Sequence, residues 1–340
     1  MENCGIDLHQ SNSEICILDE SGEVMEKTSL RTTRKVLDRF FSGKPRMRVV
    51  MEAGGSSPWV SRLVERCGHE VVVCSPRRVR LIAESTMKTD GIDAEVLARL
   101  VRIDPGFLGS VTHRSEEAQL LRSKMTVRSS LVEARTKWIN TVRGILRGFG
   151  YRVPGGTPKT FPQRVARLDL PTDLRVVIEP LLTQLELVTT EIDRREEDLK
   201  AVAEEIPVVA HLQRIPGVGL IVALYYVLTI DDPERFRRSQ DLAGFFGLRP
   251  TMRSSGASSH YGRITKQGDP EMRRLLIQAA HGMMRTRTTS HLQLWAAKLA
   301  GRRGKSKALV ALARKLAVLM HHLWVTGEVY EAFPNKKKAA

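Results

Sequence analysis

The hydrophobic periodicity of the chain changes once, near residue 112. Before this point, short apolar segments are separated by turn residues and polar helices, which is typical of a mixed α/β sheet. After it, apolar residues recur at steps of three, four and seven, which is typical of helices. With 340 residues, 42% of them hydrophobic, the chain is long enough to bury the cores of about two domains. The change in period therefore predicts an α/β part followed by an α part.

The first part, residues 1–112, predicts a small mixed sheet. Residues 4–29 alternate as short strands with a tight turn at "ESGE", which predicts a β-meander. A polar helix in "TTRKVLDRFFSG", a strand in "RMRVVMEA", a helix in "SPWVSRLVERCG" and a strand in "EVVVCSP" follow. Three meander strands followed by alternating helices and strands favour a mixed α/β sheet.

The second part, residues 113–205, predicts two long amphipathic helices separated by a segment rich in Pro and Gly, 151–171. One apolar stripe comprises Leu131, Trp138, Val142, Ile145 and Phe149, and the other comprises Leu181, Leu185, Val188, Ile192, Leu199 and Val202. The two helices can pair as an antiparallel coiled-coil hairpin or dimerise with another copy.

The third part, residues 206–330, predicts a mostly helical C-terminal domain, followed by a basic tail at 331–340. Its last helix, "KSKALVALARKLAVLMHHLW", is apolar enough to be buried against its neighbours. Because the tail "PNKKKAA" is short, polar and terminal, we expect it to fray.

Charge and cysteine content narrow the function. Lys and Arg number 54 against 38 Asp and Glu, so the formal charge is +16. This predicts a polyanionic partner such as nucleic acid, with a merely basic soluble protein as the alternative. The four cysteines have no C-x-x-C spacing, which disfavours a zinc ribbon or a disulfide framework and favours a reducing cytosol. No signal peptide and no apolar run of about 20 residues is present, so we expect a soluble, unexported protein.

Four carboxylates are candidates for a metal site. Asp7 lies in the apolar strand "CGIDL", where an unpartnered charge is costly, and Glu52 ends the strand "RVVMEAGG". Asp90 and Asp93 are three residues apart at the start of a helix and share one face, so a helix across the sheet could bring all four together. Hard oxygen ligands suit one or two Mg²⁺ or Mn²⁺ ions, and two-metal sites serve phosphoryl transfer.

The structural alternative is that each acid has a local role. Asp90 would then be favoured by the helix macrodipole, Asp93 would be a surface residue, and Asp7 would lie at a strand edge.

The segments that carry these acids resemble a known family. "GIDLHQSNSEICILDESG", "VVMEAGGSSPWVSRLVERCGHEVVVCSPRRVR" and "KTDGIDAEVLARL" are similar to the N-terminal domain of DEDD transposases, insertion-sequence recombinases with a RuvC-like, RNase H-like domain. The resemblance implies that Asp7, Glu52, Asp90 and Asp93 form the acidic tetrad that binds Mg²⁺. It also places the basic residues of "PRRVR" (Arg77, Arg78, Arg80) and Lys88 in nucleic-acid-binding blocks.

The C-terminal part resembles the transposase domain of the same family. "IPGVGLIVALYYV" resembles a helix-hairpin-helix, in which Gly217 and Gly219 would let backbone N–H groups approach a phosphate. The alternative is an ordinary turn between helices that needs glycine.

A serine in the same part is the candidate nucleophile. "RSSGASSHYGR" taken alone predicts a flexible loop, but the resemblance implies that Ser255, or the adjacent Ser254, attacks DNA and forms a phosphoserine link. Nearby cations could stabilise the developing charge: Arg253, Arg263, Lys266 and Arg273. The stretch "ASSHY" departs from the family pattern, while "GRITKQGD" follows it.

Three functions remain to be distinguished. The first is a site-specific DNA recombinase of an insertion sequence, for which the resemblance implies a guide (bridge) RNA that pairs with donor and target DNA. The second is a metal-dependent nuclease for branched DNA without a serine intermediate. The third is a non-catalytic nucleic-acid-binding protein. The long helices and the roughly 160 residues between Asp93 and Ser255 predict a homodimer or homotetramer with a shared site, in the bacterial cytosol and associated with the nucleoid.

Overall fold

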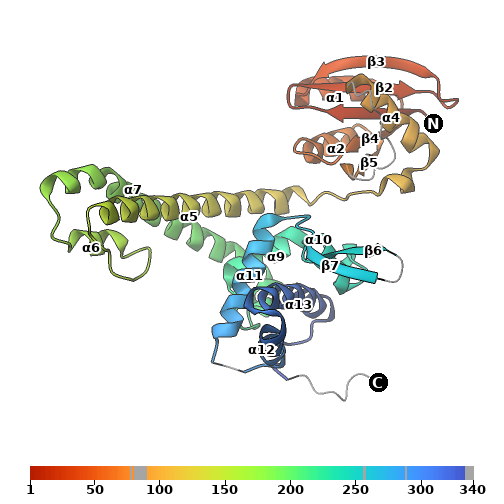
Figure 1. Ribbon diagram of the computed structural model, residues 1–340. Coiled ribbons are helices and arrows are strands. Elements are labelled where there is room, and N and C mark those ends of the chain that lie inside the picture. The colour runs from red at the N-terminus through yellow and green to blue at the C-terminus, as the bar shows by residue number, and fades with distance from the viewer. Residues whose placement is uncertain (77–78, 80–89, 256–257, 288, 334–340) are drawn as a thin grey trace. The chain divides into compact units, whose positions relative to one another are not determined.

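The computed structural model describes two compact units, Met1–Arg114 and Ser115–Ala340 (Figure 1). It describes the whole chain except residues 77–78, 80–89, 256–257, 288 and 334–340, and only the backbone of 90–92, 253–255 and 258–261. The segments 113–205 and 206–330 lie in one unit, and their separation into functional domains stays a prediction.

The first unit is built on a five-stranded mixed sheet, as predicted. Its strands are β1 (Asn3–Leu8), β2 (Asn12–Leu18), β3 (Val24–Arg31), β4 (Arg48–Glu52) and β5 (Glu70–Cys74), in the order β3-β2-β1-β4-β5. The meander β1–β2–β3 is antiparallel, whereas β4 and β5 run parallel to β1. This order is consistent with the RNase H-like arrangement that the resemblance implies.

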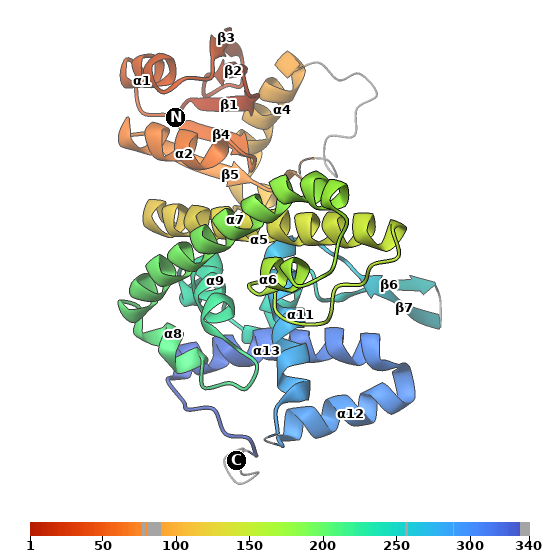
Figure 2. The ribbon, with the colours of Figure 1, turned by 90° about the vertical axis from the view of Figure 1, so that its left-hand side faces the viewer.

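Helices cover both faces of this sheet. Cys4 and Ile6 pack with α1 (Arg34–Ser42) and α2 (Ser57–Arg66) on one face, where Leu37 and Phe41 are fully buried. The opposite face, which carries Cys16 and Val50, is covered by α4 (Asp90–Ile103) (Figure 2). A short 3₁₀ helix, η1 (Pro105–Leu108), follows. Because successive residues of a strand point to opposite faces, the even-numbered residues of β1 face α1 and α2, and the odd-numbered residues face α4.

The contact between α4 and β1 is unusually close because of Gly5. A Cβ atom at Gly5 would lie 2.0 Å from the Ala94 carbonyl oxygen and 2.7 Å from the Ala98 backbone nitrogen. The absent side chain therefore lets the backbone of α4 lie directly on the strand. The small residues Ala94 and Ala98 are buried there.

The second unit begins with two 33-residue helices, α5 (Glu116–Gly148) and α7 (Thr172–Glu204), which pack side by side (Figures 1 and 2). The predicted stripe of α7 is largely confirmed, because Leu185, Val188, Ile192 and Leu199 are buried. The stripe of α5 is only partly confirmed. Val142 is buried, but Phe149 is 67% exposed, because it caps the end of α5 instead of continuing it.

The segment between these helices contains a short helix that the sequence did not predict, α6 (Phe161–Ala166). Phe161 and Val165 of α6 are fully buried with Val142 and Leu146 of α5. The Pro- and Gly-rich segment therefore folds back onto the ends of the long helices. Their supercoiling as a coiled coil stays a prediction.

The rest of the unit is a helical core with one β-hairpin. Its elements are α8 (Pro207–Leu212), α9 (Leu220–Ile230), η2 (Pro233–Arg235), η3 (Ser239–Asp241), α10 (Leu242–Phe245), β6 (Pro250–Ser255), β7 (Ser258–Ile264), α11 (Pro270–Arg285), α12 (His291–Arg303) and α13 (Lys305–Thr326). The apolar helix α9 is surrounded by its neighbours, and the buried Tyr226 hydroxyl donates to the Ala317 carbonyl oxygen at 2.6 Å. By length and composition α13 could cross a membrane, but it packs against α11 and α12 within this core.

An ion pair ties α5 to this core. Arg122 of α5 pairs with Asp269 and donates to the Tyr225 hydroxyl at 2.7 Å, and the Arg122 and Asp269 side chains are only 18% and 13% exposed. Asp269 also caps α11, because its Oδ1 accepts from the Met272 backbone N–H at 3.0 Å. One carboxylate therefore holds three helices together: α5, α9 and α11.

We expect Gly5→Ala to destabilise the first unit, because the new methyl group would collide with the backbone of α4. Overpacking of this kind costs about 1–3 kcal/mol, and a contact with backbone places the expected loss at the upper end. All four cysteines belong to this unit, and burial raises the pKa of Cys4 and, together with the charge of Glu52, raises that of Cys74 to about 12. Cys67 is only half-buried, so pulsed labelling in urea of the three buried thiols, Cys4, Cys16 and Cys74, measures the unfolding of this unit alone.

The matched control is Gly55→Ala, since a Cβ atom at Gly55 would meet nothing within 4 Å. Equal urea midpoints for Gly5→Ala and Gly55→Ala would contradict the close packing of α4 on β1.

Candidate catalytic site

Two of the four predicted acids lie side by side at one end of the sheet. β1 and β4 are parallel, with Ile6 opposite Met51, so the next residue of each strand, Asp7 and Glu52, lies at the same carboxyl end. Both are two residues beyond a residue of the face covered by α4, Gly5 in β1 and Val50 in β4. Because strands alternate, Asp7 and Glu52 also face α4.

The third acid, Asp93, lies on the helix that crosses this face. It directly precedes Ala94, whose carbonyl oxygen is in contact with Gly5. Its side chain is half-buried. Asp90 is the first residue of α4, and its side chain lies outside the described part of the chain. Asp93 is thus the neighbour in sequence of Ala94, and Ala94 contacts Gly5, which lies two residues before Asp7 in β1.

Two residues of this site were missed by the sequence analysis. His9 Nε2 lies 3.1 Å from Asp7 Oδ2, and Glu14 of β2 is the antiparallel partner of Asp7. Glu14 accepts a hydrogen bond from Ser29 at 2.5 Å and lies on the α4 face, two residues before Cys16. The antiparallel register of β1 and β2 places Glu14 there, and the sequence analysis did not assign that register.

Glu52 acts on its neighbour in the sheet. Burial, and to a smaller extent the charge of Glu52, raises the pKa of the Cys74 thiol to about 12. Glu52 and Cys74 are direct partners in the register of β4 and β5. Among the described side chains, no three His, Cys, Asp or Glu residues come close enough to hold a metal ion. The donor set at this edge is carboxylate oxygen, which fits Mg²⁺ or Mn²⁺ better than it fits softer metals.

The candidate serines lie in a β-hairpin of the second unit. β6 and β7 pair antiparallel, with Ser254 opposite Ser259 and Ser255 opposite Ser258. The expectation of a flexible loop for this stretch, drawn from its composition alone, was therefore wrong for the residues on the two strands. Ser255 is the last residue of β6.

The base of this hairpin is fixed by backbone contacts that only glycine permits. A Cβ atom at Gly247 (φ +66°) would lie 2.0 Å from the Gln267 carbonyl oxygen, and one at Gly268 (φ +80°) would lie 2.0 Å from the Phe245 carbonyl oxygen. Arg273 completes the base, because its Nη1 donates to the carbonyl oxygens of Phe246, Gln267 and Gly268 at 2.9–3.2 Å. The hairpin therefore projects from a rigid base.

The glycines of the predicted helix-hairpin-helix differ in role. Gly217 (φ +86°) packs against α11, where a Cβ atom would lie 2.3 Å from the Ala279 carbonyl oxygen. Gly219 precedes α9, is exposed, and has open space where a Cβ atom would lie. Packing alone thus accounts for Gly217, and a phosphate contact at either glycine stays a prediction.

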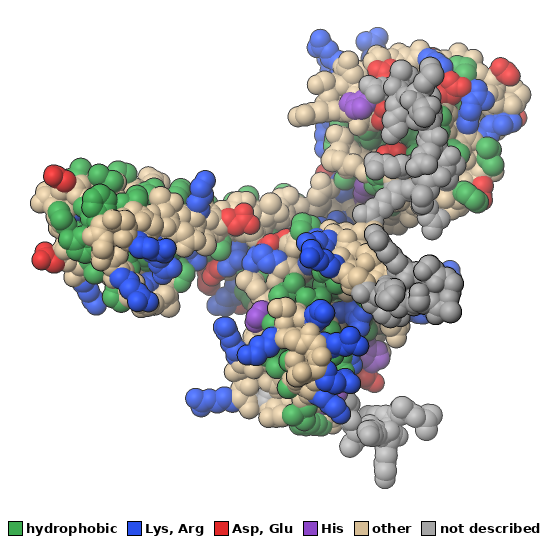
Figure 3. Space-filling view, viewed as in Figure 1, with side chains coloured by type: hydrophobic (Ala, Val, Ile, Leu, Met, Phe, Trp, Pro, Cys, Tyr) green, Lys and Arg blue, Asp and Glu red, His purple; other side chains and the backbone are tan. Residues whose placement is uncertain are grey.

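The predicted basic residues are only partly described. Arg77, Arg78, Arg80 and Lys88 lie outside the described residues, and of Arg253 only the backbone is described. Arg263 and Lys266 are exposed near the base of the hairpin. Figure 3 shows many Lys and Arg side chains on the viewed face of the second unit. A nucleic-acid contact by any of them, or by Arg273, stays a prediction.

Comparisons with known proteins agree with this arrangement. Residues 4–150 match a family model for DEDD transposases of the IS110 type, and residues 209–295 match one described as the transposase IS116/IS110/IS902 family. The first match contains the sheet with α4, and the second contains the hairpin of β6 and β7, residues 250–264, called the serine hairpin below. The protein is thus a transposase, an enzyme that cleaves and rejoins DNA.

Curated relatives match over nearly the whole chain. The transposase for insertion sequence element IS1111A of Coxiella burnetii is 31% identical over 96% of this chain and 90% of its own length. The transposase for insertion sequence element IS1328 of Yersinia enterocolitica is 29% identical, and a probable family 20 transposase of Pseudomonas aeruginosa is also 29% identical; these cover 96% and 94% of the chain and 97% and 96% of the relatives. The chain belongs to the IS116/IS110/IS902 family of insertion-sequence transposases.

Proposed function

We propose that this transposase is an RNA-guided, site-specific recombinase that cleaves and rejoins DNA through a phosphoserine intermediate. The observation that supports the proposal most directly is the crossing of α4 over β1. It lays α4, which carries Asp93, across the face of the sheet that Asp7 and Glu52 also face, in the domain that resembles metal-dependent nucleases.

The carboxylates would hold the metal. Asp7, Glu52, Asp90 and Asp93 supply oxygen ligands for Mg²⁺ or Mn²⁺, and Glu14 lies within reach of the same edge. When bound, such an ion would stabilise negative charge on the phosphate oxygens and lower the pKa of a hydroxyl group. His9, hydrogen-bonded to Asp7, would keep that carboxylate oriented.

Ser255 would carry the strand-transfer chemistry. Its Oγ would attack a DNA phosphorus atom, forming an O–P bond while the bond from phosphorus to one deoxyribose oxygen breaks. The serine would lose its proton, and the leaving strand would gain one as a free hydroxyl group. A hydroxyl group of another strand would then attack the phosphoserine, which reverses the step and joins the new strand. Arg263 and Lys266 would stabilise the charge that develops on the phosphate.

A guide RNA would select the DNA. The family resemblance implies that this RNA pairs with both donor and target, so the protein itself would recognise backbone and duplex shape. The formal charge of +16 supports a large polyanionic partner. We place this complex in the bacterial cytosol, on the nucleoid, where its DNA lies.

The site would be shared between subunits of a homodimer or homotetramer. The acidic residues and Ser255 belong to different units of the chain, so the acids of one subunit can serve the serine of another. The long helices α5 and α7 would provide the pairing surface.

Ser255→Ala is expected to abolish the covalent protein–DNA adduct, because the nucleophile is lost. The rate of strand cleavage should fall at least about 10³-fold, as for other lost nucleophiles. The measurement is denaturing electrophoresis of labelled element DNA after reaction with the full protein and the RNA from its own locus.

Ser254→Ala is the matched control and should keep the adduct. Loss of the adduct in Ser254→Ala alone would move the nucleophile to Ser254. Undiminished cleavage in both variants would instead support the metal-dependent nuclease without a serine intermediate.

Glu52→Gln is expected to abolish cleavage, because it replaces a charged metal ligand by a neutral amide. An equal mixture of Glu52→Gln and Ser255→Ala proteins should recover part of the activity, because a shared site can combine the intact serine of one subunit with the intact acids of another. The readout is cleavage at rising Mg²⁺ concentration.

Glu70→Gln is the control, since Glu70 begins β5 and pairs there with Arg48. An active Glu52→Gln protein would refute the metal site, and a mixture without activity would refute the shared site.

A discrete RNA is expected to co-purify with the protein when it is expressed from its natural locus with the flanking DNA intact. The RNA would be retained at moderate salt, because it would contact many basic residues, and sequencing would map it next to the gene. Recovery of only mixed cellular RNA would contradict RNA guidance while leaving the serine mechanism testable on its own.

A further inference from the structure

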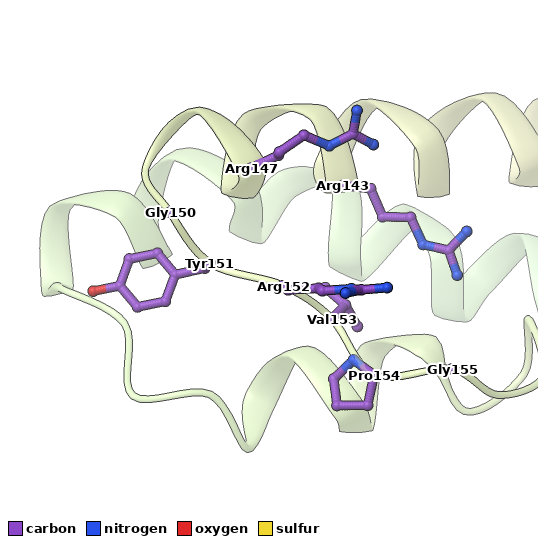
Figure 4. Close-up of a pocket in the computed structure, with 8 residues that line it drawn as sticks. All are labelled: Arg143, Arg147, Gly150, Tyr151, Arg152, Val153, Pro154 and Gly155. Atoms are coloured by element: carbon purple, nitrogen blue, oxygen red, sulfur yellow. The ribbon is translucent and has the colours of Figure 1, made fainter.

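The far end of the long helices contains a cavity that the proposed catalytic chemistry does not use. It measures about 920 Å³ and is lined by Arg143 and Arg147 of α5 and by the loop 150–155 that leaves this helix. The guanidinium groups of Arg143, Arg147 and Arg152 extend to the same side, whereas the Tyr151 ring extends to the other (Figure 4).

All the charged residues of the surrounding sequence are basic. From residue 134 to residue 168 the chain contains no Asp or Glu and eight Lys or Arg, namely Arg135, Lys137, Arg143, Arg147, Arg152, Lys159, Arg164 and Arg167. These 35 residues therefore contribute +8, half of the formal charge of +16, in about a tenth of the chain. Such a concentration of one sign of charge raises the local concentration of anions.

The end of α5 does not need the arginines as caps. The Gly150 backbone N–H donates to the Arg147 carbonyl oxygen at 3.1 Å, and the Tyr151 N–H donates to the Leu146 carbonyl oxygen at 2.9 Å. With Gly150 at φ +83°, this is a Schellman motif, which satisfies the last carbonyl groups through the backbone. The guanidinium groups therefore remain available for a ligand.

The three arginines that line the cavity also form no ion pairs with the described carboxylates. Within the described part of the chain, no carboxylate lies within 4.0 Å of Arg143, Arg147 or Arg152. Arg164, by contrast, has a structural role, because it donates to the carbonyl oxygens of Pro154, Thr157 and Thr160. Arg143 also lies 5.3 Å above the buried Phe161 ring, which restricts its side chain before any ligand binds.

We propose that this cavity, the arginine cavity, binds the phosphodiester backbone of a nucleic acid. Planar guanidinium groups match the geometry of phosphate oxygens, and three of them facing one opening can hold consecutive phosphates. None of the residues that line this cavity belongs to the proposed carboxylate site or to the serine hairpin, so they would position nucleic acid without taking part in strand transfer. The proposal rests on the membership in a transposase family and not on the serine mechanism.

The test is a fluorescence-anisotropy titration of the full chain with two probes, a labelled DNA duplex and a labelled single-stranded RNA, at several salt concentrations. When the logarithm of the binding constant is plotted against the logarithm of the salt concentration, each phosphate contact contributes about 0.9 to the slope for duplex DNA and about 0.7 for single strands. The triple variant Arg143→Gln, Arg147→Gln, Arg152→Gln should therefore reduce the slope by about 2 to 3 and raise Kd at least tenfold at moderate salt. The probe that shows the loss identifies DNA or RNA as the ligand.

The control removes the same charge from the same segment outside the cavity: Lys137→Gln, Lys159→Gln, Arg167→Gln. This control variant should change the slope by less than the contribution of one phosphate contact. Equal losses in the two triple variants would overturn the site in favour of a diffuse basic surface, and no loss with either probe would overturn it altogether. If the first triple variant has a lower melting temperature than the unsubstituted protein, the single variant Arg152→Gln replaces it in the test. Arg152 lies in the loop outside the helix, and its loss should reduce the slope by about 1. Covalent adduct formation by Ser255 is a separate readout, so failure of one proposal leaves the other standing.

Discussion

The close contact of α4 with β1 is the constraint on which the N-terminal unit depends. Gly5 has no side chain, so the backbone of α4 can rest on the strand at Ala94 and Ala98. The same contact fixes where Asp93 lies relative to the carboxyl ends of β1 and β4, which carry Asp7 and Glu52. A side chain at this position would hold the helix, and Asp93 with it, further from the sheet.

The sequence predicted the sheet well because its signals are local. Alternating residues, turns and short apolar runs indicated the five strands. The cost of burying a charge in an apolar strand pointed to Asp7, and the end of a strand pointed to Glu52. The sequence analysis missed Glu14, because its proximity to Asp7 depends on the pairing of β1 with β2, and it missed His9, which lies only two residues beyond Asp7. It also gave Phe149 a place in the buried stripe of α5. A periodic pattern does not show where a helix ends, and α5 ends at Gly148.

For the serine hairpin, local composition predicted a loop where the structure has two paired strands. Ser and Gly residues have low strand propensity, so composition alone predicted a loop, and tertiary contacts override that preference. The base of the hairpin is held by Gly247, Gly268 and Arg273, which contact backbone atoms of Phe245, Phe246, Gln267 and Gly268. Local strand propensity does not report these contacts. Family resemblance, which reflects the whole fold, made Ser255 the candidate nucleophile where local propensity did not, and that role stays a prediction.

The ion pair between Arg122 and Asp269 also has a mechanical consequence. Arg122 lies near the beginning of α5, and Asp269 caps the helix that directly follows the serine hairpin. From this anchor to the end of α5 at Gly148 the helix extends about 40 Å, at about 1.5 Å per residue. A tilt of about 5° at the anchor would therefore move the far end by about 3.5 Å, a little more than the rise of two residues along the helix. A small movement at this ion pair would thus be enlarged at the arginine cavity.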